Sequence, residues 1–230
     1  TARTAGDPLR SGATLGDGAG GSCEFEPDRS FAEALRARTG EAPGEGRLFH
    51  LAMSEFSLDT LEELDRQGYA RPDLDEVVAA AIHGVDAAYV RGMAGSGYRL
   101  DSLERLTAFR IHDVTPEYVS AMAALGPHFR NLAAEDLMAL SLHDVTPDYV
   151  RGLAAAGIAP ADAGDLVGLR IHGVTPEGVR ALAAAGYGDL TVEQHMAFAI
   201  HEVTPAFIRE MTAAGHGDLS ASQLISSRIH

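Results

Sequence analysis

The chain has 230 residues, enough for a sizeable hydrophobic core, and its 33 acidic and 18 basic residues give a formal net charge of −15 at pH 7. Such an acidic balance argues against nucleic acid or an anionic membrane surface as the main partner. The single cysteine, Cys23, excludes an internal disulfide framework and a thiolate zinc cluster. The longest apolar run, residues 77–82, is far shorter than the roughly 18 residues of a membrane span. We therefore expect no membrane insertion.

Residues 1–24 are rich in Gly, Ala, Ser and Thr and offer little that could pack into a core. This composition predicts a flexible linker. The glycine-rich run at 16–21 is similar to a phosphate-binding loop, but it has no flanking strand, no following helix and no lysine. We predict no phosphate site there.

Residues 170–177, Arg-Ile-His-Gly-Val-Thr-Pro-Glu, have the pattern of a junction between two helices. His172 suits the last turn of a helix, where a cation faces exposed carbonyls, and Gly173 suits the left-handed residue that ends it. Thr175 is a typical N-cap, and Pro176 then occupies the first helical position, where a missing N–H costs nothing. One helix is thus predicted to end here and another to begin.

This junction recurs along the chain. Its histidine returns at intervals of 29 residues, with one interval of 31, at His83, His112, His143, His172, His201 and His230. Two further steps of 29 towards the N-terminus reach Ser54 and Phe25, followed by the cap residues Ser57 and Asp28. We count seven repeats, which begin at residues 25, 54, 83, 112, 143, 172 and 201. A fixed period of this length is typical of a solenoid.

Each repeat contains the pattern of two short helices. In the repeat that begins at His172, the first helix ends at Gly186, and Thr191 with Gln194 forms the capping box of the second. Helices of about ten residues are marginally stable alone, so they must stack on neighbouring repeats. We therefore predict an all-α, right-handed solenoid of helical hairpins over residues 25–230.

The run from His172 to Tyr187, His-x-Val-Thr-Pro-Glu-x-Val-Arg-x-Leu-x-Ala-x-Gly-Tyr, resembles the tandem tails of bacterial membrane metallopeptidases of the β-lactam-receptor type. Similar tails occur on other bacterial envelope-signalling proteins. The resemblance covers residues 25–230 and includes no peptidase domain. It implies a sensing or docking segment that lies outside the cytoplasmic membrane. That location, the periplasm, follows from the resemblance alone, and without the resemblance we expect a cytoplasmic location.

The six aligned histidines raise the possibility of metal binding, because neutral imidazole is a common metal ligand. Stacked repeats would space their rings by about 10 Å, however, whereas each ligand must lie about 2 Å from zinc. We favour helix-terminal histidines that hydrogen-bond to backbone. Metal- or pH-responsive binding through His83, His112, His143, His172, His201 and His230 stays a lower-ranked alternative.

Two sets of aligned arginines are candidates for partner binding. One set lies early in the first helices: Arg91, Arg151, Arg180 and Arg209. The other immediately precedes the repeated histidine: Arg110, Arg170 and Arg228. Together they could line a groove for an acidic peptide or a glycan carboxylate. The simpler interpretation is local pairing, as between Asp148 and Arg151 or Glu177 and Arg180, and favourable interaction with helix dipoles.

Aromatic residues follow the N-cap of the first helix in four repeats, at Tyr89, Tyr118, Tyr149 and Phe207. We interpret them as packing residues rather than a binding stripe, and Gly178 leaves a gap in their order. No Gly-x-Ser-x-Gly nucleophile motif is present, and Cys23 has no histidine near it in sequence. We predict no enzymatic activity and no cofactor.

Three functions remain. The favoured one is a non-catalytic scaffold that binds a protein or peptide, or senses a signal, through an extended solenoid surface. The second is a structural protein that self-associates end to end. Ser226 and Ser227 argue against it, because they predict a solvated outer face on the last repeat. The third is the metal- or pH-responsive binding described above.

Overall fold

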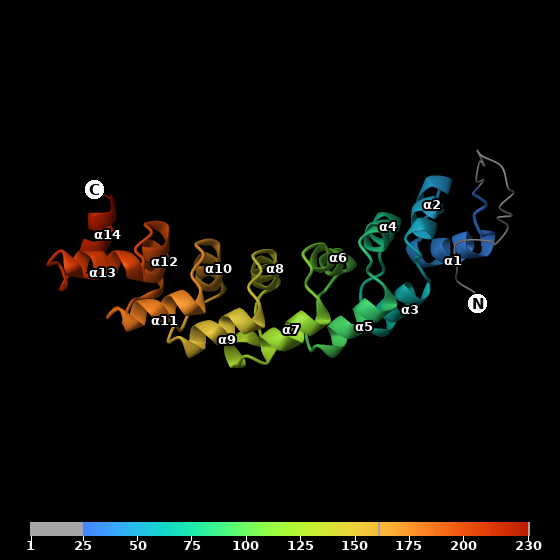
Figure 1. Cartoon of the computed structure of the whole chain (residues 1–230). Helices are drawn as coiled ribbons and strands as arrows, with labels where there is room; N and C mark the ends of the chain where they lie inside the picture. The colour runs from blue at the N-terminus through green and yellow to red at the C-terminus, as the bar shows by residue number, and fades with distance from the viewer. Residues whose placement is uncertain (1–24, 161, 230) are drawn as a thin grey trace, which may run out of the picture. The chain divides into compact units, whose positions relative to one another are not determined.

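The computed structural model describes residues 25–160 and 162–229, and this part of the chain contains fourteen α-helices, one 3-10 turn and no strand. Seven pairs of helices correspond to the seven predicted repeats (Figure 1). The predicted linker, residues 1–24, and His230 lie outside the described residues.

The first helices of the repeats are α1 (Arg29–Thr39), α3 (Asp59–Arg66), α5 (Ala87–Gly95), α7 (Pro116–Ala123), α9 (Pro147–Ala155), α11 (Pro176–Ala184) and α13 (Pro205–Ala213). The second helices are α2 (Glu45–Met53), α4 (Leu74–Ile82), α6 (Leu103–Ile111), α8 (Ala134–Leu142), α10 (Ala163–Ile171), α12 (Val192–Ile200) and α14 (Ala221–Ile229). The 3-10 turn η1 (Pro127–Phe129) lies in the one repeat of 31 residues.

The chain divides into two compact units, one up to Ser120 and one from Ala121. In the first unit α3 packs on α5, and α2, α4 and α6 pack in succession. In the second unit α9 packs on α11, and α8, α10, α12 and α14 pack in succession. Each unit therefore has a row of first helices and a row of second helices (Figure 1). The prediction of an all-α repeat solenoid is confirmed.

The helices begin where the sequence predicts caps. The Thr175 side chain accepts a hydrogen bond from the Gly178 N–H at 3.0 Å, and Thr191 forms the predicted capping box with Gln194. The prediction of Ser57 as the N-cap of α3 was wrong by one residue. Leu58 precedes the helix without a side-chain cap, and the Ser57 hydroxyl oxygen instead accepts the Asp59 N–H at 3.2 Å.

The second helices end in a shared backbone turn. After Ile171, His172 is the C-cap, Gly173 adopts a left-handed conformation with φ of 70°, and the Val174 N–H donates to the Leu169 carbonyl at 2.9 Å. This is the Schellman arrangement, which satisfies carbonyls that the helix leaves free. Acidic residues replace the glycine and keep a positive φ in four repeats, at Glu55, Asp113, Asp144 and Glu202.

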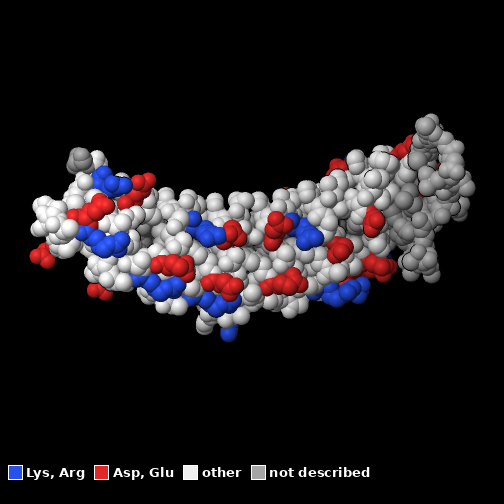
Figure 2. Space-filling view, viewed as in Figure 1, with Lys and Arg blue, Asp and Glu red and all other residues white. Residues whose placement is uncertain are grey.

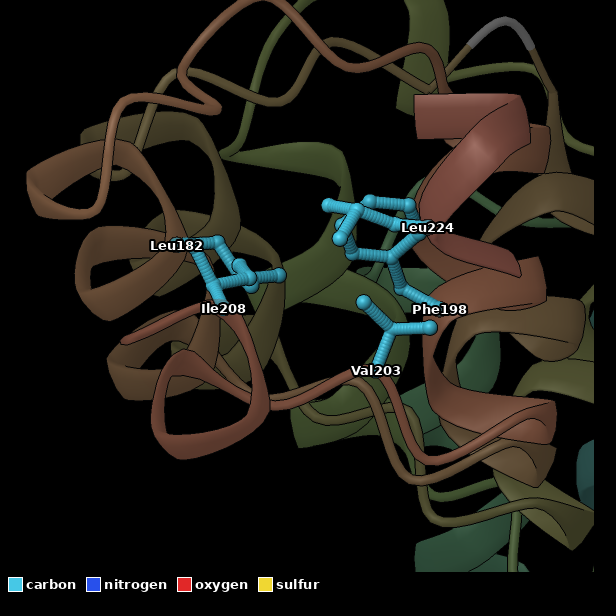
Figure 3. Close-up of a cluster of buried hydrophobic side chains, with 5 residues drawn as sticks. All are labelled: Leu182, Phe198, Val203, Ile208 and Leu224. Carbon is cyan, nitrogen blue, oxygen red and sulfur yellow. The ribbon is translucent and has the colours of Figure 1, made fainter. Parts of the chain in front are cut away.

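The valine of this turn is the centre of each junction. Its exposed fraction does not exceed 7% in any of the five repeats that carry it, at Val85, Val114, Val145, Val174 and Val203. Figure 3 shows Val203 facing Leu182 of α11, Phe198 of α12, Ile208 of α13 and Leu224 of α14. One turn residue thus joins two successive helix pairs, which is how short helices become stable.

We predict that Val174→Asp will strongly destabilise the protein. An unpaired carboxylate would be buried at a site that is 7% exposed, and such changes cost about 3–5 kcal/mol. Gly173→Asp is the matched control, because it adds the same charge one residue away, at an exposed slot that holds Asp in two other repeats. Thermal unfolding should show a large decrease in the free energy of unfolding for Val174→Asp and a decrease of about 1 kcal/mol for the control. Equal losses would contradict this account of the junction.

Candidate functional site

The repeated histidines are helix-terminal residues, as predicted. His83, His112, His143, His172 and His201 are each the C-cap of a second helix. The backbone N–H of His172 donates to the Gly168 carbonyl at 3.1 Å. Among the described residues, no three His, Cys, Asp or Glu side chains come together as a metal site. His230 lies outside the described residues.

The residue before the repeated histidine, or before Ser54 in the same slot, is apolar and exposed at the end of all seven second helices. These residues, which we call the aliphatic ladder, are Met53, Ile82, Ile111, Leu142, Ile171, Ile200 and Ile229. Between 50% and 69% of each is exposed to solvent. A single exposed isoleucine is ordinary on a protein surface, but an aligned series in each unit forms a patch that the fold does not need. The sequence analysis missed this series, although seven apolar residues in one slot were the signal.

The surface around the ladder is also apolar. Residues three and four positions earlier lie on the same side of a helix as the ladder residue. In α8, α10 and α12 these positions hold small or apolar residues that are half-buried: Met138, Ala139, Val167, Gly168, Met196 and Ala197. The ladder therefore belongs to a wider apolar surface on the second helices.

The arginines of the first helices are mostly engaged within the chain. Arg91 pairs with Glu63 at 3.1 Å, and Glu63 is buried. A hydrogen bond from Gln67, and then the nearby Arg91 and Arg66, hold the pKa of Glu63 below its usual 4.5. The predicted local pairs are confirmed, with Arg151 at 2.6 Å from Asp148 and Arg180 at 2.7 Å from Glu177. Arg209 is exposed.

The arginines that precede the histidine lie over aromatic rings. The guanidinium carbons of Arg110, Arg170 and Arg228 are 5.1–5.3 Å from the ring centres of Tyr89, Tyr149 and Phe207. Arg170 also pairs with Asp144, and Arg228 pairs with Glu202 at 3.1 Å. Figure 2 shows basic atoms next to acidic atoms over much of the visible face. These side chains tie the end of a repeat to its beginning, so the structure offers no row of unpaired arginines in these positions.

Two of the aromatic residues also connect neighbouring repeats. The buried hydroxyl of Tyr89 donates to the Val114 carbonyl at 2.8 Å, and that of Tyr149 donates to the Val174 carbonyl at 2.7 Å. The packing interpretation of these tyrosines is confirmed. We refer to the tyrosine or phenylalanine and the arginine that covers it as the aromatic clamp.

Both members of this clamp are present in the repeats that begin at residues 83, 143 and 201, and the repeat that begins at His172 has neither. Gly178 stands in the aromatic slot, Ala199 in the arginine slot and Gly173 in the acidic slot. A cavity of about 380 Å³ lies here, lined by all three of these residues. Its other walls include Val179, Leu182 and Phe198, and Val203, Glu202 and Arg228 of the next repeat. The gap that Gly178 leaves in the aromatic series is therefore a cavity in the folded protein.

His195 gives this cavity an unusual polar lining. It is 3% exposed, and its Nδ1 is buried without a hydrogen-bond partner. Burial lowers the pKa of His195 below its usual 6.5, because a charged imidazolium loses its hydration there. In the repeats that begin at residues 83, 112, 143 and 201 the same slot holds Leu106, Leu137, Leu166 and Leu224. The sequence analysis missed His195, and this exception among leucines was the available signal.

The fold and these surfaces define a helical repeat protein with an exposed aliphatic ladder and an open cavity beside Gly178. No protein-family model, curated protein or solved structure matches the chain. None of the described helices is both long and apolar enough to cross a bilayer.

We predict that Tyr149→Phe will lower stability by about 1 kcal/mol, since the Val174 carbonyl loses its donor. Burial raises the pKa of Tyr149 above 10.0, and Arg170 opposes that shift. The neutral hydroxyl therefore stabilises the fold fully below pH 10, and this contribution falls as the pH rises further. Between pH 8 and pH 11, the free energy of unfolding measured with a chemical denaturant should fall less in the variant than in the wild type. An unchanged free energy of unfolding at pH 8 would contradict the assigned hydrogen bond.

His195→Leu should stabilise the protein by about 1–2 kcal/mol at pH 7, because it removes an unpaired buried nitrogen and restores the residue type of the other repeats. The lowered pKa of His195 means that the unfolded chain binds the proton first, so wild-type stability falls as the pH drops below 6.5. Between pH 7 and pH 5, the free energy of unfolding should fall less in the variant than in the wild type. His216→Leu, at an exposed site in the same unit, is the control and should change neither value.

Proposed function

We propose that this protein is a non-catalytic binding module whose aliphatic ladder docks a protein or peptide segment. The observation that supports this proposal is the exposure of an Ile, Leu or Met in the same slot of every repeat, where stacking of the repeats does not require it. Solenoid proteins commonly bind partners along such continuous surfaces. The resemblance to tails of bacterial envelope-signalling proteins is consistent with a docking or sensing role.

Burial of the ladder can supply part of the binding free energy, and further contacts must offset the remaining cost of association. Full burial of an isoleucine side chain contributes about 1.5–3 kcal/mol, so a ladder residue that is half exposed contributes about 1 kcal/mol when a partner covers it. The four ladder residues of the second unit, Leu142, Ile171, Ile200 and Ile229, would together favour binding by about 4 kcal/mol before the costs of association. A partner that presents apolar side chains along its length therefore fits this surface.

The charge balance favours a partner with basic residues. The chain has 33 acidic and 18 basic residues, and six of the seven candidate arginines pair with acids or cover aromatic rings of the chain itself. The chain therefore carries more acidic groups than its own basic residues can pair. We infer an amphipathic segment with apolar residues on one side and Lys or Arg around them.

A displayed library of amphipathic peptides provides the test. Peptides selected on the whole chain should lose at least tenfold in affinity for the double variant Ile171→Asn with Ile200→Asn, because two apolar contacts of about 1 kcal/mol each disappear. Both side chains are exposed, so the melting temperature should change little. The control, Arg151→Ala with Arg180→Ala, alters exposed arginines of the first helices and should retain binding.

Two outcomes would contradict the proposal. If only the arginine variant lost binding, the partner would be acidic and would use the first helices. If light scattering found a concentration-dependent mass that the asparagine variant abolished, the ladder would bind a second copy of the chain, as in the self-assembly alternative.

A further inference from the structure

We propose that the cavity beside Gly178 is a binding site for an uncharged, para-substituted phenol. The class includes small phenolic compounds and the tyrosine side chain of another protein. The proposal stands apart from the aliphatic ladder, because it depends on a cavity between two successive repeats and on different residues.

The first argument comes from the repeats that keep the clamp. In the preceding repeat the Tyr149 ring occupies the aromatic slot, and its hydroxyl donates to the Val174 carbonyl at 2.7 Å. Gly178 and Val203 hold the same two slots one repeat later. Gly178 has no side chain to fill this space or to donate to the Val203 carbonyl. The protein thus shows, in its own Tyr149, the group that such a space accommodates.

The second argument is that neighbouring residues have also changed in ways that keep the space open. Ala199 replaces the arginine that would cover the ring. In the preceding repeat, Gly152 of α9 lies against Pro176. A Cβ added to Gly152 would lie 2.7 Å from Pro176 Cγ, so this close packing requires a glycine. Ala181 occupies the corresponding position and carries that Cβ. Pro205, the counterpart of Pro176 in the next repeat, lines the cavity.

The third argument concerns the chemistry of the walls. Val179, Leu182 and Phe198 provide apolar contacts, and a volume of about 380 Å³ lies within the range of small-molecule sites. His195 adds a buried polar group whose Nδ1 has no partner. Arg228 and Glu202 form an ion pair with 3.1 Å between a guanidinium nitrogen and a carboxylate oxygen. The pair leaves little net charge in the cavity wall to attract an anion or a cation. An uncharged aromatic ring with one hydroxyl matches this combination.

Titration of the whole chain by NMR tests the proposal, with the His195 imidazole signals as the local readout. The probes are p-cresol and N-acetyltyrosinamide, each paired with an analogue that lacks the donor, 4-methylanisole and N-acetylphenylalaninamide. We expect saturable shifts at His195, with each phenol at least threefold tighter than its partner, since a hydrogen bond to a carbonyl contributes about 0.5–1.5 kcal/mol. Preference for p-cresol would indicate a small-molecule ligand, and preference for N-acetyltyrosinamide a tyrosine side chain.

Two substitutions locate the site. Gly178→Tyr should fill the cavity with the chain's own phenol, abolish the shifts caused by added phenol and raise the melting temperature. Gly178→Ala, which adds only a Cβ at 3.3 Å from the Thr175 hydroxyl, should retain binding. If Gly178→Tyr fails to fold, Ala199→Arg locates the site instead, because its guanidinium would cover the bound ring as Arg170 covers Tyr149 and should tighten phenol binding.

The proposal is overturned if neither phenol shifts the His195 signals at about 20 mM, the concentration at which ligands of this size bind detectably. It is also overturned if Gly178→Tyr folds and still binds p-cresol, since the phenol would then bind elsewhere. Equal affinity for p-cresol and 4-methylanisole would refute recognition of the hydroxyl.

Discussion

Stacking of short helices is the constraint on which the whole structure depends. The helices have 8–11 residues each, too few to be stable in water without a partner. The buried valine after each histidine solves this problem, because it contacts the helix pair that ends and the pair that begins. Around it, the Schellman turn and the threonine cap satisfy backbone groups at both helix ends. A repeat therefore needs its neighbours both for its hydrophobic core and for the angle between its helices.

Residues that this constraint does not explain are the ones that point to function. Stacking accounts for the buried leucines and valines, the caps and the tyrosine hydroxyl bonds. It does not account for an exposed aliphatic residue in every repeat, nor for a repeat in which glycine and alanine replace the aromatic clamp. The first feature occurs in all repeats and suits a long partner. The second occurs once and suits a single small group.

The period of 29 residues was sufficient to predict the helices and their order. Thr175 and Thr191 mark helix starts, and Gly173 and Gly186 mark helix ends, because only a few residue types satisfy or tolerate these backbone conformations. Ser57 was the exception, since its hydroxyl bonds to Asp59 in a turn before the helix rather than in the cap itself. Cap and turn residues therefore predict the helix ends of this chain well where a residue type strongly prefers one backbone conformation.

The candidate sites were harder to predict. The slot of Ile171 looked like an ordinary apolar position, because periodicity predicts which residues share a face but not which faces a neighbouring repeat covers. Arg170 looked available for a ligand until the structure placed it over Tyr149 and beside Asp144, a residue 26 positions earlier. The sequence revealed the gap at Gly178, yet not whether neighbouring side chains would fill it.

By itself the sequence determined the repeat, its two helices, the residues that begin and end them, and the acidic character of the chain. The helix ends depend on contacts within about five residues, a regular period makes them visible, and the net charge follows from composition alone. Only the tertiary structure decided that the ladder residues are exposed, that the arginines are engaged, and that the loss of one aromatic ring leaves a cavity beside a buried histidine. Those properties depend on packing between residues about one repeat apart, where small differences in side-chain volume decide whether a space is filled or open.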